Sequence, residues 1–127
     1  MMPSIHTSKL HWACMLVCLM LAHGTSAQPL ARMEVTEIKP LLLRAIDHGA
    51  AHGVLVGESA TYLRQKFDAR TPIDIDVQVL HPLPQPGCSR LEVKTRQKDV
   101  LEKAQRSDKE LVYQVSYCRD GRFPDKR

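Results

Sequence analysis

Few residues in this 127-residue sequence have types and spacing suited to chemistry, and the cysteines are the most informative of them. Cys14 and Cys18 lie in an apolar N-terminal segment, whereas Cys88 and Cys118 lie in the second half of the chain. Redox-active pairs usually follow a C-x-x-C pattern, and structural zinc sites gather four ligands at short spacings. Cys88 and Cys118 fit neither pattern, so in an oxidising compartment we expect them to form one structural disulfide.

The segment "HGAAH" places His48 and His52 four residues apart, the spacing at which two imidazoles on one helical face can bind a metal ion. Gly49 stands where a metalloprotease has its glutamate, and it also weakens a helix at this point. Zinc needs three or four ligands, and the obvious further ones are only His81 and Glu58. We therefore predict no metal site and no other cofactor.

Asp74 and Asp76 alternate with apolar residues in "PIDIDVQVL", so their side chains should point to the same side of a strand. Such a pair could act as general acid and base or bind a cation. The same pattern is typical of a half-buried strand whose charged face meets basic neighbours across the sheet, and we favour this interpretation.

The segment "GESAT" is similar to the G-x-S-x-G motif of serine hydrolases, but Thr61 stands in place of the second glycine. We expect Ser59 to be the N-cap of a helix instead. Since no catalytic residue can be assigned, the sequence predicts a protein that is not an enzyme.

The N-terminal residues have the three parts of a secretory signal peptide. A polar segment with Lys9 precedes the apolar run 13–22, and Thr25 and Ala27 occupy the −3 and −1 positions of a small-residue cleavage site. A membrane-spanning helix needs roughly 20 apolar residues, and this run is about half that length. We predict a signal peptide over 1–27, a periplasmic or secreted protein, and no stable membrane anchor.

Residues 28–127 are then expected to form a single small domain with a charged C-terminal tail. They retain every lysine and arginine except Lys9 and all 14 acidic residues, which leaves a mildly positive charge with both signs interspersed. A nucleic-acid-binding surface would cluster positive charge beside stacking aromatic side chains. Only five aromatic residues follow the signal segment, so we expect no nucleic-acid partner.

Alternating apolar residues predict three strands in the second half, at about 73–79, 88–96 and 110–118. The last two pair as an antiparallel hairpin if Cys88 opposes Cys118, because this register also places Leu91 opposite Val115 on one apolar face. The disulfide would then join the strands at the open end of a long hairpin, on the face away from the core. The polar segment 99–111 predicts a loose helical turn or a flexible hairpin connection.

Two helices are expected before these strands. Pro40 suits the first turn of one helix and Gly49 suits its end, while Ser59 would begin the other. The segment "GVLVG" between them predicts a short strand or a buried turn. The expected fold class is α+β, with two N-terminal helices packed on a small three-stranded antiparallel sheet that carries one disulfide.

The segment "CRDGRFP" predicts an exposed turn, because Asp120-Gly121 suits a position with positive φ. Arg119, Arg122 and Phe123 would form a compact contact surface of the kind that protein interfaces favour. The alternative is a frayed tail whose Phe123 packs back onto the sheet.

The motifs "GCSRLEV" and "YCRDGRFP", behind a signal peptide, resemble those of small exported proteins from the transfer regions of conjugative plasmids and integrating elements of Gram-negative bacteria. The resemblance covers about residues 53–124, and the matching positions are Gly87, Cys88, Arg90, Leu91, Cys118, Asp120, Gly121 and Pro124. It implies a periplasmic accessory to conjugative transfer and brings no catalytic residues.

The sequence thus predicts a periplasmic protein-interaction module that binds a protein partner in the cell envelope. The alternative is an exported inhibitor or immunity-type protein that blocks a hydrolase through a loop such as 118–124. The sequence carries no signal for the oligomeric state.

Overall fold

The computed structural model describes residue 24 and residues 30–126, so nearly all of the predicted signal peptide, 1–27, lies outside the described residues. The elements are β1 (Met33–Val35), α1 (Lys39–His48), β2 (Ala50–Leu55), α2 (Glu58–Lys66), β3 (Ile73–Pro82), β4 (Cys88–Glu102) and β5 (Gln105–Cys118). No helix in this part of the chain is long and apolar enough to cross a membrane.

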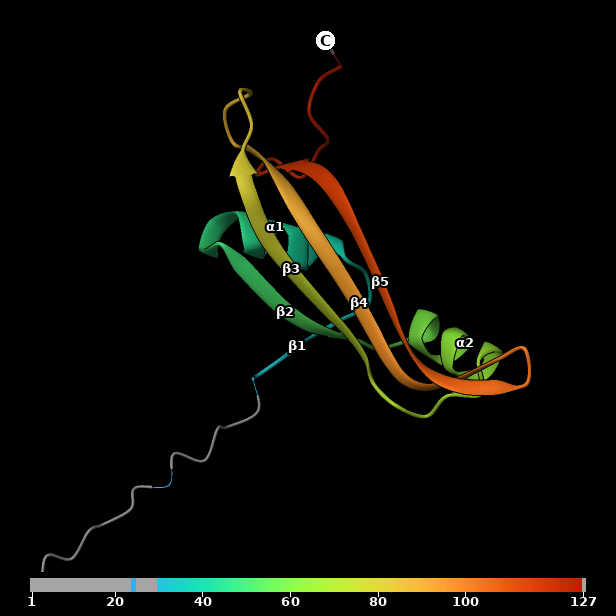
Figure 1. Ribbon diagram of the computed structural model, residues 1–127. Helices are drawn as coiled ribbons and strands as arrows, with labels where there is room; N and C mark the ends of the chain where they lie inside the picture. Colours follow the sequence, from blue (N-terminus) through green and yellow to red (C-terminus); the bar gives the residue numbers. More distant parts are fainter. Residues whose placement is uncertain (1–23, 25–29, 127) are drawn as a thin grey trace, which may run out of the picture.

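The strands form one five-stranded mixed sheet in the order β1-β2-β3-β4-β5 (Figure 1). β1 and β2 are parallel and are connected by α1, while all later neighbours are antiparallel. The prediction of a three-stranded antiparallel sheet preceded by two helices is therefore wrong. The helices number two, as expected, but they alternate with strands of the same sheet.

The two additional strands have weak local signals: β1 was not predicted, and β2 overlaps the segment "GVLVG", for which a short strand was one of two expectations. β1 is three residues long, and β2 reads "AAHGVL", in which alanine and glycine disfavour strand structure. Gly53 occurs there because Leu41 of α1 packs on its backbone: a Cβ at residue 53 would lie 2.7 Å from a methyl carbon of Leu41. The strand therefore depends on a tertiary contact that no local pattern records.

Helix α1 forms as predicted. Pro40 lies in its first turn, and Gly49 ends it with a φ of 89°. Leu41, Leu42 and Ala45 are buried on one face of the sheet, together with the alternating apolar residues of β3 and β4. α1 thus covers the core, and it leaves the opposite face of the sheet to solvent.

The predicted N-cap at Ser59 is wrong. Gly57 holds that position with a φ of 83°, and Ser59 lies inside α2 without a capping hydrogen bond. Figure 1 shows α2 beside the far end of the β4–β5 hairpin, away from α1. There the backbone N–H of Leu101 donates to the carbonyl of Phe67 at 2.9 Å.

The predicted hairpin register is confirmed. Cys88 opposes Cys118, and Leu91 opposes Val115. Segment 99–111 is neither a helical turn nor a flexible connection, because β4 and β5 continue to a two-residue turn at Lys103 and Ala104. A bulge between Gln97 and Val100 adds one residue to β4. The extra residue shifts the alternation of side chains, so the sequence pattern did not reveal that the strand continues.

Candidate functional site

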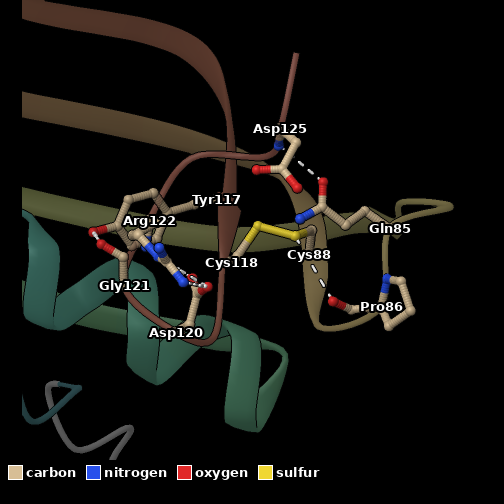
Figure 2. The surroundings of a disulfide bond; sticks show 9 residues. All are labelled: Gln85, Pro86, Cys88, Tyr117, Cys118, Asp120, Gly121, Arg122 and Asp125. Carbon is tan, nitrogen blue, oxygen red and sulfur yellow. Dashed lines mark hydrogen bonds and ion pairs between the residues drawn. A yellow bond between two sulfur atoms is a disulfide. The ribbon is translucent and has the colours of Figure 1, made fainter. Parts of the chain in front are cut away.

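The disulfide between Cys88 and Cys118 joins the open end of the β4–β5 hairpin (Figure 2). Both cysteines are 3% exposed, and they lie outside the main core cluster. The backbone N–H of Arg119 donates to the carbonyl of Gly87 at 2.8 Å and continues the pairing past the bridge. The bridge therefore holds the start of the C-terminal turn to the sheet.

Residues 119–124, here named the C-terminal turn, are tied back to the fold by several further bonds. The N–H of Cys118 donates to the carbonyl of Arg122 at 2.9 Å, and the buried Tyr117 hydroxyl donates to the carbonyl of Gly121 at 2.7 Å. The ring of Phe123 packs edge-on against Tyr117, with 5.3 Å between centroids. The backbone of this segment is thus hydrogen-bonded to the fold, and Phe123 packs back onto β5 as the alternative prediction expected.

The three side chains predicted to form a contact surface all belong to this turn, and each is mostly exposed. The exposed fractions are 66% for the Arg119 side chain, 82% for the Arg122 side chain and 68% for Phe123. Arg119 pairs with Asp47 of α1 at 3.0 Å, and Arg122 pairs with Asp120 at 3.2 Å. Exposed ion pairs of this kind are worth less than about 1 kcal/mol, so a partner can take over either guanidinium.

A second cluster lies on the open face of the sheet around Asp76. This carboxylate accepts hydrogen bonds from Arg32 Nη1 at 2.8 Å and from Arg96, and its Oδ1 lies 2.8 Å from His52 Nδ1. Burial alone would raise the pKa of Asp76. The hydrogen bonds from Arg32 and His52 and the positive charges of Arg32 and Arg96 outweigh it and hold that pKa below its ordinary value.

This cluster supports the structural interpretation of Asp74 and Asp76. Arg96 lies opposite Asp74, and Lys94 lies opposite Asp76, so the carboxylates meet basic neighbours across the sheet as predicted. A carboxylate bound by two guanidinium groups is a poor general base, because its charge is already neutralised. The sequence pattern did not reveal Arg32, because it precedes β1 and reaches Asp76 only through the parallel pairing of β1 with β2.

Comparison with protein-family models, curated proteins and solved structures finds no match to this chain. Its function has to be argued from its own residues.

His48 and His52 do not share a helical face. His48 is the last residue of α1, whereas His52 lies in β2 and faces Asp76. Gly49 ends the helix between them, so the four-residue spacing no longer places the two imidazoles on one helical face, where they could share a metal ion. The described residues contain no group of three potential metal ligands among their histidine, cysteine, aspartate and glutamate side chains.

A hollow of about 570 Å³ lies between the start of β3 and the middle of the hairpin. It is lined by three acidic and three basic side chains, from Asp74, Arg96, Lys98, Asp108, Lys109 and Glu110. Because the two signs balance, this hollow creates no net field that would concentrate a charged substrate. The C-terminal turn is therefore the better candidate site.

Proposed function

We propose that this chain is an exported protein-binding module without catalytic activity, and that its contact surface is the C-terminal turn. One observation carries the proposal: the backbone of the turn is tied at several points, yet Arg119, Arg122 and Phe123 are mostly exposed. Binding side chains on an ordered backbone avoids the entropy cost of ordering a loop. Arginine and aromatic residues are also the types that most often dominate binding energy.

The compartment and the biological setting rest on the sequence. The signal-peptide pattern of residues 1–27 supports export, and an oxidising compartment suits the Cys88–Cys118 bridge. The resemblance over residues 53–124 supports a role as a periplasmic accessory of conjugative transfer. We take the partner to be a protein of the cell envelope.

An exported inhibitor is the second candidate, and the same turn favours it. Inhibitory loops that block hydrolases are held rigid so that they bind with little loss of entropy. The disulfide and the hydrogen bond from the Tyr117 hydroxyl to Gly121 constrain the turn in this way. Adding the purified protein to hydrolases encoded beside its gene tests this candidate, and dose-dependent loss of hydrolysis favours inhibition over an accessory role.

The main test replaces both Arg122 and Phe123 by alanine and measures binding of envelope proteins encoded beside the gene. The matched control replaces Arg70 and Tyr62, an arginine and an aromatic residue that are exposed elsewhere. We expect partner binding to be lost in the turn variant and kept in the control, with melting temperatures close to that of the unmodified protein. Retained binding in the turn variant, or equal loss in both, contradicts the proposal.

A further inference from the structure

The outer edge of β5 carries three consecutive exposed apolar side chains. Leu111, Val112 and Tyr113 are 61%, 46% and 41% exposed. Edge strands of soluble proteins are usually protected by proline, bulges, charges or short length, because their unpaired backbone groups bind other strands. From Lys109 to Cys118, β5 pairs with β4 without a bulge, and it contains no proline. Figure 1 shows β5 as the last strand of the sheet.

The backbone groups along this edge are directed outward at every second residue. The N–H of Cys118 donates to Arg122, which lies outside β4, so it points away from the hairpin partner. Antiparallel strands alternate this direction at each residue, so the N–H groups of residues 110, 112, 114 and 116 point the same way. The bond to Arg122 closes the edge at Cys118, and the open edge therefore ends at Ser116.

We propose that this edge binds the same edge of a second copy of the chain, with the two β5 strands antiparallel and Val112 on the two-fold axis. The two sheets then form one continuous sheet. Leu111 of each copy lies opposite Tyr113 of the other, and Ser116 lies opposite Asp108. The pairing covers residues 108–116 of both strands and stops where the C-terminal turn begins. This surface is separate from the contact surface of the turn.

The order of side chains selects this register. A two-fold axis perpendicular to the sheet places the helix-covered faces of both copies on the same side of the joined sheet. Such an axis passes midway between the two copies of one β5 residue, and an axis through a residue is meant in this sense. An axis through Leu111 places Val112 opposite Glu110 and Tyr113 opposite Lys109. An axis through Tyr113 places Val112 opposite Gln114. Only the axis through Val112 pairs the three exposed apolar residues with one another.

Charge complementarity on the open face supports the same register. Arg90 reaches over β5, where Nε donates to Gln114 at 3.1 Å and Nη1 donates to Ser116 at 3.0 Å. Neither Arg90 nor Glu110 forms an ion pair within the described part of the chain, because the Arg96 opposite Glu110 binds Asp76 instead. With Val112 on the axis, Glu110 of one copy lies opposite Gln114 of the other. Adjacent strands are about 4.8 Å apart, so the carboxylate of Glu110 then lies beside the guanidinium of Arg90, twice in each dimer.

The first test compares the native protein, with its disulfide intact, and the Val112→Pro variant by sedimentation equilibrium. The N–H of Val112 points away from β4, and edge strands accept proline whose nitrogen faces outward. We expect the native protein to sediment at twice the chain mass, and the variant to sediment as a folded monomer. A native protein that stays monomeric up to about 0.1 mM overturns the proposal.

Cysteine cross-linking tests the register. Opposite residues whose backbone groups point away from each other are the closest across an antiparallel pair, and Leu111 and Tyr113 form such a pair in this dimer. A mixture of the Leu111→Cys and Tyr113→Cys variants should give a disulfide-linked heterodimer under mild oxidation, while neither variant cross-links alone. Cross-linking of Leu111→Cys alone or of Tyr113→Cys alone places the axis on that residue and overturns the register proposed here.

A charge exchange gives a test that does not depend on proline. Glu110→Arg should raise the dimer dissociation constant about tenfold or more, because it opposes Arg90 at two places. Adding Arg90→Glu to the same chain should restore dimerisation. If neither change alters the dissociation constant, the contact between Glu110 and Arg90 is contradicted. Alanine at Arg122 and Phe123 should leave the dimer intact, which separates this proposal from that of the C-terminal turn.

Discussion

The side chain of Leu41 in α1 lies directly against the backbone of Gly53 in β2. A Cβ at residue 53 would lie 2.7 Å and 2.8 Å from the two methyl carbons of Leu41, and 3.1 Å from the carbonyl oxygen of Met33. Leu41 is fully buried, so its methyl groups have little room to move. This contact allows α1 to pack closely over the parallel β1–β2 pair.

Gly53→Ala should destabilise the fold by roughly 1–3 kcal/mol, because the added methyl group overpacks the core. Urea unfolding followed by circular dichroism measures the loss. The control is a double-mutant cycle with Leu41→Ala, which removes the two methyl carbons that clash. The double variant should be less unstable than the sum of the single changes, and simple additivity would show that the contact is not the cause.

Cys88→Ala and Cys118→Ala should each destabilise the protein by roughly 2–5 kcal/mol, as loss of a native bridge does in a small exported domain. The two losses should be equal and should not add in the double variant, because both changes remove the same bond. Intact mass measured after alkylation under native conditions provides the check. Two alkylated cysteines in the native protein are inconsistent with the bridge.

Asp76→Asn should lower stability at neutral pH by about 1–2 kcal/mol, because it removes the charge that Arg32 and Arg96 bind. The folded pKa of Asp76 is below the unfolded value, so its contribution is complete above about pH 4 and declines as the pH falls through the folded pKa. The difference between variant and native protein should therefore shrink on acidification. Free energies of unfolding measured between about pH 3 and pH 7 test this.

Asp74→Asn serves as its control. Asp74 Oδ1 lies 3.5 Å from Arg32 Nε, and its side chain is 35% exposed. Removal of this charge changes the net charge by the same amount but leaves the hydrogen bonds of Asp76 in place. A pH-dependent loss as large as that of Asp76→Asn would assign the effect to net charge.

Ala104→Gly should stabilise the hairpin by about 1 kcal/mol. Lys103 and Ala104 have φ values of 50° and 62°, and a residue with a Cβ is strained in this region. The melting temperature should rise accordingly. Ser107→Gly, a change within the extended part of β5, should instead lower stability by about 0.5–1 kcal/mol, which shows that the gain depends on the turn conformation.

Local patterns in the sequence predicted the features that depend on neighbouring residues. The alternation in "PIDIDVQV" marks β3, and Pro40 and Gly49 mark the ends of α1. The hairpin register followed from only two facts, the spacing of Cys88 and Cys118 and the apolar face that this spacing aligns. Pairing Cys88 with Cys118 fixes every other pair in the hairpin. Because side chains alternate between the two faces, this register also places the apolar residues on one face, so the sequence was sufficient here.

The candidate site was predicted only in part. Arg119, Arg122 and Phe123 were identified from residue type and from the turn at Asp120-Gly121. The contacts that hold their backbone were not predicted, because a single sequence does not show that Arg119 N–H meets the carbonyl of Gly87 or that the Tyr117 hydroxyl meets the carbonyl of Gly121.

The tertiary structure alone decided the size and type of the sheet. β1 is only three residues long, and β2 contains alanine and glycine, which disfavour strands. Both form because α1 brings them side by side and packs Leu41 on Gly53. The cluster around Asp76 has the same origin, since Arg32, His52 and Arg96 come from three separate segments. Strand pairing between distant segments gains its energy from long-range contacts, which a single sequence does not record, whereas periodicity and covalent pairing are written into the chain itself.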